Sequence, residues 1–126
     1  MKSAKDYLAE ANAVVPKLSS AEAVELYNQG GAVFVDVRDS SAIASSGAIA
    51  GAERVARGMI EFAADPAIEA FYNDKLKKDA KICLICGAGG QAALAGKTLQ
   101  DMGYEDVVNI GGFKDWVAAD GPVEEG

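Results

Sequence analysis

A short apolar run followed by a turn almost without side chains is the feature that most constrains the fold. Residues 81–86, Lys-Ile-Cys-Leu-Ile-Cys, have the pattern of a strand buried on both faces. A glycine-rich turn over residues 87–91 follows at once, and apolar residues then recur at helical spacing over residues 92–102. A buried strand that passes through such a turn into a helix is typical of an α/β protein with a parallel sheet.

The rest of the chain alternates between helical and strand patterns. Ser19 and Glu22 form a capping box, and Asp65-Pro66 is a further helix start. The expected helices are Met1–Val15, Ser19–Gly30, Ser40–Gly47, Gly58–Ala64, Ala67–Lys77, Ala92–Met102 and Phe113–Ala119. The expected strands are Ala32–Val37, Ala52–Ala56, Lys81–Cys86 and Asp106–Ile110. This alternation predicts an α/β fold with a central, mainly parallel sheet and helices on both faces.

Pro16 separates an amphipathic N-terminal stretch from the rest of the chain. Tyr7 and Leu8 are the large apolar residues of this stretch, which is otherwise rich in charge and alanine. The rest of the chain contains no internal repeat and no linker-like segment. The sequence therefore predicts a loosely attached helical extension over residues 1–17 and one domain over residues 18–126.

Composition excludes several classes of site and partner. The chain has no histidine and two cysteines, which excludes Ser-His-Asp and Cys-His catalysis, histidine-containing metal sites and a four-cysteine zinc site. We therefore expect neither a metal nor a cofactor. The net charge of −7 argues against nucleic acid and anionic membranes as partners. The sequence shows no export signal and no membrane span. A disulfide between two cysteines only three positions apart would constrain little of the unfolded chain, so we expect free thiols in a reducing, cytoplasmic location.

Cys86 stands where a strand ends and the glycine-rich turn begins. Successive backbone N–H groups in such a turn form an anion-binding nest, and the start of the following helix adds partial positive charge. A thiolate at the centre of this nest is favoured, so Cys86 is a candidate nucleophile that needs no neighbouring base. The alternative is that Cys86 is only a small buried apolar residue, which is the expected role of Cys83 within the strand.

Two other motifs overlap this turn. Cys83 and Cys86 have the spacing of a redox pair, but strand geometry sends them to opposite faces of the sheet. The pattern G-x-G-x-x-A from Gly87 to Ala92, with Asp106 further along, resembles a dinucleotide-binding fingerprint. That fingerprint normally opens a larger doubly wound domain, whereas this one comes near the end of the chain.

Taken together, several segments resemble the single-domain rhodanese-like sulfurtransferases over roughly Ser19 to Val123. The segments are Asp36-Val37-Arg38, Gly47–Ala52, Arg57-Gly58-Met59, the Cys86 turn, Ala92–Tyr104, and Asn109–Phe113 with Trp116 and Pro122. The resemblance implies a rhodanese-like fold with a five-stranded central sheet. Six residues from Cys86 to Gln91 match the length of the family's active loop, which suits a sulfur atom, whereas related phosphatases have a longer loop.

The resemblance also implies a mechanism and a set of site residues. Cys86 would take a sulfane sulfur from thiosulfate or a persulfide and pass it, as a Cys86 persulfide, to a thiol or cyanide; a protein persulfide is a further candidate donor. The expected substrate-binding residues are Gly87, Ala88, Gly89, Gly90, Gln91, Ala92 and Arg57. Asp36 and Arg38 are expected to be structural residues near the site.

Departures from the family pattern keep a second function open. Gln91 stands where arginine is usual, so an anionic donor loses a charge-assisted contact. Ala92 stands where the family commonly has serine or threonine, and Ala48 where it often has histidine. Ala42 lies near the position where the family commonly has an acidic residue, which would pair with Arg38. The sequence therefore predicts a sulfurtransferase with weak thiosulfate activity or, alternatively, a catalytically weak or inactive binding and regulatory module. A redox sensor is a third candidate.

Overall fold

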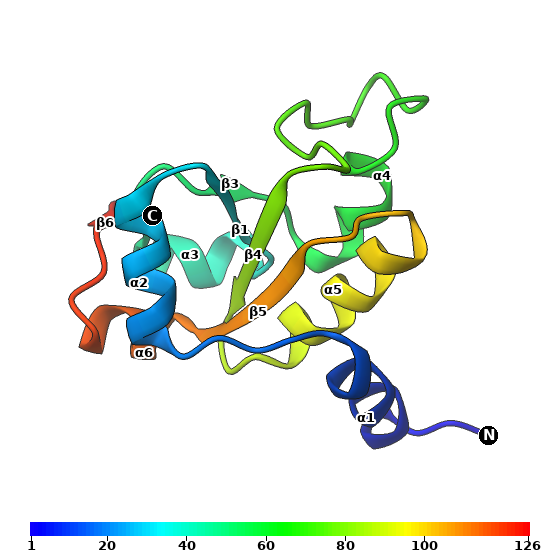
Figure 1. Ribbon diagram of the computed structural model, residues 1–126, viewed down its shortest axis with the longest axis horizontal. Coiled ribbons are helices and arrows are strands. Elements are labelled where there is room, and N and C mark those ends of the chain that lie inside the picture. The colour runs from blue at the N-terminus through cyan, green and yellow to red at the C-terminus, as the bar shows by residue number, and fades with distance from the viewer.

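Four parallel strands form the central sheet of the computed structural model, which describes residues 1–126 (Figure 1). Their order across the sheet is β3-β1-β4-β5. Every neighbouring pair is parallel, as the alternation of strands and helices predicted. The strands are β1 (Ala32–Asp36), β3 (Glu53–Arg54), β4 (Lys81–Cys86) and β5 (Val107–Gly112).

The edge beside β5 accounts for the difference from the expected five strands. A single parallel bridge joins Lys17 to Asn109 there, with the Asn109 N–H donating to the Pro16 carbonyl at 2.8 Å. Proline has no N–H to donate, so this pairing does not extend into a strand. A separate antiparallel pair, β2 (Ala48–Ile49) with β6 (Val123–Glu124), is too short to leave a periodic pattern in the sequence.

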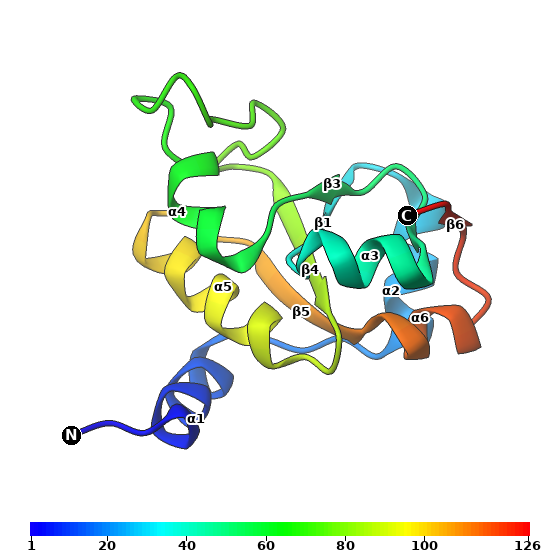
Figure 2. The same cartoon turned by 180° about the vertical axis from the view of Figure 1, so that it is seen from behind.

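Helices cover both faces of the sheet, as expected (Figures 1 and 2). One face packs against α2 and α6, and the other against α4 and α5. None of the helices has the length and apolar character needed to cross a membrane. Their bounds are α1 Ala4–Val14, α2 Ser20–Gln29, α3 Ser40–Ser46, α4 Ile60–Ala63, α5 Gly90–Asp101 and α6 Phe113–Ala118, with a 3₁₀ turn at Arg57–Met59 before α4.

The predicted helix over Ala67–Lys77 is wrong. This segment forms a series of turns in which only Leu76 is buried. The Asp65 carboxylate accepts from the N–H of Ala67, and the Asn73 side-chain oxygen accepts from the N–H of Lys75. Such local side-chain bonds compete with helical bonds, and they favour turns where little apolar surface is available to stabilise a helix.

The N-terminal helix α1 packs against α5 near the connection from β4 (Figures 1 and 2). Ala11 and Val15 are buried in this contact, and the Gln100 side chain donates to the Val14 carbonyl at 2.9 Å. A Cβ atom at Gly96 would lie 2.8 Å from Val15 Cγ1. The glycine therefore permits the close approach of α1, which is more firmly attached than the sequence suggested.

Candidate active site

The carboxyl ends of the parallel strands bring most of the predicted site residues to one end of the sheet. Cys86 ends β4, Asp36 ends β1, and the connection after β3 leads to Arg57. The Cys86 partner in β5 is Gly112, next to a register shift that ends regular pairing. Open parallel sheets bind ligands at this end of their strands.

Backbone N–H groups surround the Cys86 sulfur. The N–H of Gly89 lies 2.9 Å from Sγ, and the N–H of Ala92 lies 3.4 Å from it. Because α5 begins at Gly90, the Ala92 N–H is one of the first helical donors, which have no partner within their own helix. Cys86 is 1% exposed, while Gly87, Ala88 and Gln91 on the outside of the loop are exposed. The loop therefore holds the sulfur as an acceptor of two backbone hydrogen bonds.

Asn109 and Gly112 hold the loop in this shape. The Asn109 side-chain amide donates to the Gly89 carbonyl at 2.9 Å and accepts from the N–H of Gly111 at 2.9 Å. A Cβ atom at Gly112 would lie 2.5 Å from the Gly87 carbonyl oxygen, so only glycine fits there. Neither residue was predicted as part of the site, although a buried asparagine within an apolar strand is a signal for such a role.

Asp36 and Arg38 form a buried ion pair at the end of β1. Arg38 Nη2 lies 2.7 Å from Asp36 Oδ2, and Nε lies 3.0 Å from Oδ1. The guanidinium also donates to Ser46 Oγ at 2.7 Å and to the Gly47 carbonyl at 2.9 Å, and lies 4.5 Å from the centre of the Phe113 ring. Asp36 thus supplies the carboxylate that Ala42 lacks, and the pair fixes the β1–α3 connection beside the site.

The Arg57 side chain lies against α5. Its guanidinium is 3.2 Å from Glu61 Oε1 and donates to Thr98 Oγ1 at 3.1 Å. No hydrogen bond joins it to residues 87–92. Its predicted contact with substrate stays a prediction.

The geometry opposes the two competing motifs of the sequence. Cys83 packs with α2 and α6, whereas Cys86 packs with α5 on the other face of β4, so their sulfur atoms point away from each other. Burial raises the pKa of Cys83 to about 11, as expected of a core thiol. Asp106, the acidic residue that follows the fingerprint-like pattern, precedes β5 at the opposite end of the sheet and pairs with Lys81 at 3.0 Å.

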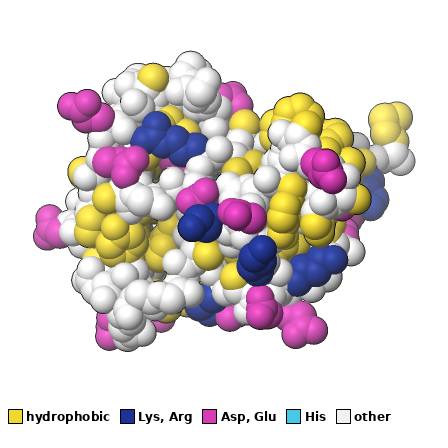
Figure 3. All heavy atoms as spheres, turned by 90° about the horizontal axis from the view of Figure 1, so that it is seen from above, with side chains coloured by type: hydrophobic (Ala, Val, Ile, Leu, Met, Phe, Trp, Pro, Cys, Tyr) yellow, Lys and Arg dark blue, Asp and Glu magenta, His cyan; other side chains and the backbone are white.

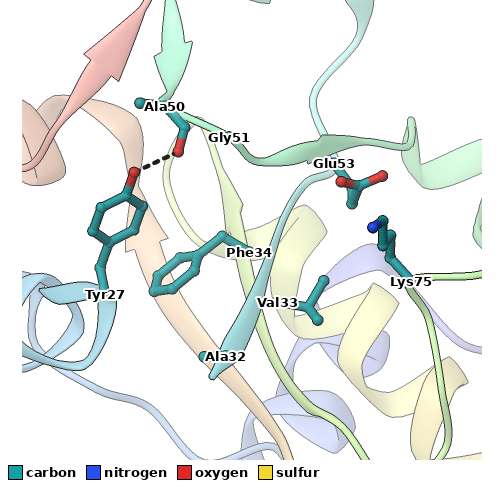
Figure 4. Close-up of a pocket in the computed structure, with 8 residues that line it drawn as sticks. All are labelled: Tyr27, Ala32, Val33, Phe34, Ala50, Gly51, Glu53 and Lys75. Carbon is teal, nitrogen blue, oxygen red and sulfur yellow. Dashed lines mark hydrogen bonds between the residues drawn. The ribbon is translucent and has the colours of Figure 1, made fainter. Parts of the chain in front are cut away.

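A hollow lies beside the first half of β1, away from Cys86 (Figure 4). It is about 320 Å³ in volume, and the Tyr27 hydroxyl crosses one end of it to donate to the Ala50 carbonyl at 2.7 Å. Glu53 and Lys75 face each other at the other end (Figure 4). The face of the molecule at the top of Figure 1 carries acidic and basic side chains that are interspersed, so it does not carry one sign of charge (Figure 3). No cysteine, serine or threonine lines the hollow.

A known domain family matches most of this chain. The family model of the rhodanese-like domain matches residues 19–119. The chain belongs to the rhodanese-like domain family. The match covers all the predicted site residues and leaves α1 outside. A comparison with curated proteins gave no match.

Solved structures extend the rhodanese-like assignment. A protein of unknown function from Rhodopseudomonas palustris, called a possible tyrosine phosphatase, is 38% identical with a TM-score of 0.91, covering 98% of this chain and 96% of its own. The human single-domain sulfurtransferase TSTD1 is 26% identical with a TM-score of 0.72, covering 82% and 96%. The polysulfide-sulfur transferase homodimer of Wolinella succinogenes is 25% identical with a TM-score of 0.74, covering 97% and 87%. Family and neighbours together support a function of the sulfurtransferase type.

Proposed function

We propose that this protein is a sulfurtransferase in which Cys86 carries the transferred sulfur as a persulfide. The observation that carries this proposal is the pair of N–H groups from Gly89 and Ala92 directed at Sγ. Electrostatic stabilisation by fixed N–H groups needs no imidazole, which this chain lacks. The outer sulfur of a persulfide would lie about 2.05 Å beyond Sγ, within the mouth of the same loop.

The reaction has two steps that balance without an external oxidant. The Cys86 thiolate attacks the outer sulfur of the donor, the Cys86 S–S bond forms, and the donor departs with the electron pair, as sulfite from thiosulfate or as a thiolate from a persulfide. An acceptor thiolate then attacks the outer sulfur, a new persulfide forms on the acceptor, and Cys86 regains its thiolate. Cyanide takes the same sulfur as thiocyanate.

The loop chemistry favours a persulfide donor over thiosulfate. Gln91 is exposed and neutral at the position where the family usually has arginine. It offers only uncharged hydrogen bonds to a dianion, and the protein itself carries a net charge of −7. A polysulfide, the donor in the name of one structural neighbour, is a dianion like thiosulfate and is disfavoured here on the same ground.

The same glutamine favours the second candidate, a binding or regulatory module that keeps the fold but does not turn over. The intact mass of the protein after exposure to thiosulfate, and separately to a small-molecule persulfide, distinguishes the two. We expect a gain of one sulfur atom that cyanide removes as thiocyanate, larger with the persulfide donor. Cys86→Ser should gain none, and Cys83→Ser should gain as much as wild type.

Absence of sulfur loading with both donors would overturn the sulfurtransferase proposal. A folded but unreactive protein that retains a partner after Cys86→Ser would instead support the binding module. Hydrolysis of a phosphotyrosine analogue that depends on Cys86 would indicate the activity suggested for the Rhodopseudomonas palustris relative.

A further inference from the structure

We propose that the N-terminal helix forms one wall of the acceptor site, where Lys17 binds the carboxylate of a small thiol. This inference rests on the proposed sulfurtransferase function and deepens it. A groove of about 320 Å³ lies between this helix and the Cys86 loop. Leu8, Asn12 and Lys17 line one side of it, and residues 88–90 line the other.

The groove borders the loop that holds the nucleophile. Gly89 lines the groove and donates its N–H to Cys86 Sγ at 2.9 Å, so one peptide unit of the loop separates the groove from the sulfur. Contacts between the two walls keep its shape: a Cβ atom at Gly90 would lie 3.5 Å from Leu8 Cδ2, and Gln100 ties the end of α1 to α5. In this proposal, the thiol of a molecule bound in the groove reaches past the Gly89 peptide to the outer sulfur of a Cys86 persulfide.

Charge selects the kind of molecule. Lys17 is the one charged residue that lines the groove, and no carboxylate of the chain lies within 4.0 Å of its ammonium group. The backbone bonds of Pro16 and Leu18 to Asn109 fix the base of this side chain. Lys17 thus places a positive charge beside the Cys86 loop, whereas Gln91 within the loop is neutral.

The size and lining of the groove point to a small thiol that carries a carboxylate. The volume is at the lower end of the range for small-molecule pockets, too small for a folded partner. Lys17 would bind the carboxylate and Leu8 would contact the carbon chain. The acceptor thiolate would attack the outer sulfur, the S–S bond at Cys86 would break, and Cys86 would leave as a thiolate.

Single-turnover transfer from preloaded protein tests this assignment. The Cys86 persulfide is formed first and the donor removed, so that donor binding does not contribute. The acceptors are N-acetylcysteine and its amide, which differ in the carboxylate. We expect Lys17→Gln to raise the half-saturating concentration of N-acetylcysteine about two- to fivefold, the size of an exposed ion pair, with the amide unchanged. Salt should reduce the difference.

Two further variants make the test selective. Lys114→Gln removes the same charge from the exposed side of α6 and should leave both acceptors unchanged. Asn12→Asp adds a carboxylate to the groove and should weaken N-acetylcysteine alone. Equal effects of Lys17→Gln on the two acceptors, or none on either, would overturn the acceptor-site assignment while leaving the sulfurtransferase proposal intact. Failure to load the persulfide at all would contradict the proposed function instead.

Discussion

At the scale of single residues, the site depends on backbone groups more than on side chains. Cys86 is the only side chain proposed to react, and its hydrogen-bond donors are the N–H groups of Gly89 and Ala92. Asn109 acts on the sulfur only through the Gly89 carbonyl that it holds. Side-chain chemistry enters at Gln91, whose exposed amide stands at the mouth of the loop.

Gln91→Arg is therefore the most informative change at this scale. A guanidinium there would give an anionic donor a charge-assisted contact worth about 1.5–3 kcal/mol, or one to two powers of ten in binding. We expect the KM for thiosulfate to fall by that factor and the KM for a persulfide donor with at most one negative charge to change less, as measured by cyanide-coupled kinetics.

Gln29→Arg is the matched control for this prediction. It makes the same charge change at the exposed end of α2, outside the Cys86 loop. An equal gain for both donors in Gln91→Arg, or a gain of the same size in Gln29→Arg, would contradict our account of position 91.

At the scale of elements, two contacts position the site. The Asp36–Arg38 pair connects the end of β1 to the end of α3 through Ser46 and the Gly47 carbonyl. Such a buried pair orders a connection more than it adds net stability, because burial of both charges carries a large desolvation cost. The second contact is α1 on α5, in which Ala11 is fully buried.

Ala11→Glu is expected to detach α1 from α5. The substitution places a charge in a buried contact that has no partner for it, which is costly. We expect limited proteolysis to cleave around residues 16–18 in this variant, while the rest of the domain stays folded by circular dichroism. The half-saturating concentration of N-acetylcysteine in sulfur transfer should also rise in this variant, because α1 forms one wall of the proposed acceptor site.

Ala13→Glu provides the matched control, since it makes the same change of residue type on the exposed side of the same helix. It should resist cleavage as wild type does. If both variants are cleaved at the same rate, loss of helix propensity rather than loss of packing is responsible, and our description of the α1 contact is wrong.

At the scale of the whole molecule, the sheet divides the interior into two cores. Cys83 lies in the core with α2 and α6, while Tyr104 lies in the core with α4 and α5. Burial raises the pKa of Cys83 to about 11 from 9.0 and the pKa of Tyr104 to about 12 from 10.0. The Tyr104 hydroxyl also donates to the Leu76 carbonyl, and the Ala64 carbonyl lies 3.3 Å from the same hydroxyl.

These two shifts predict a loss of stability at alkaline pH. Both folded pKa values are raised, so the unfolded chain loses its protons first, and the stabilisation is complete below about pH 9 and declines as pH rises toward 12. Urea unfolding across this range should show the decline. Tyr104→Phe should make the decline of the free energy of unfolding with pH shallower, and its lost hydrogen bonding should lower that free energy by the same amount at every pH. The exposed Tyr7→Phe should leave the slope of the decline unchanged. An unchanged slope in Tyr104→Phe would contradict the assignment.

The sequence by itself determined the parallel α/β class, the ends of most elements and the position of the candidate nucleophile. Each of these follows from local chemistry: the β4 run is uniformly apolar, Ser19 and Glu22 cap α2, and the glycine-rich turn follows Cys86 directly. Family resemblance added the expected mechanism and site residues. The helix expected over Ala67–Lys77 failed because its local pattern had no matching surface on which to pack.

Only the tertiary structure decided which distant residues complete the site. Asn109 reaches the loop, Asp36 pairs with Arg38 in the absence of an acid at Ala42, and Arg57 turns toward Thr98. It also brought Lys17 beside Gly89, although 72 positions separate them in the chain. Such contacts depend on how strands and helices pack across the sheet, and local periodicity carries no information about that packing.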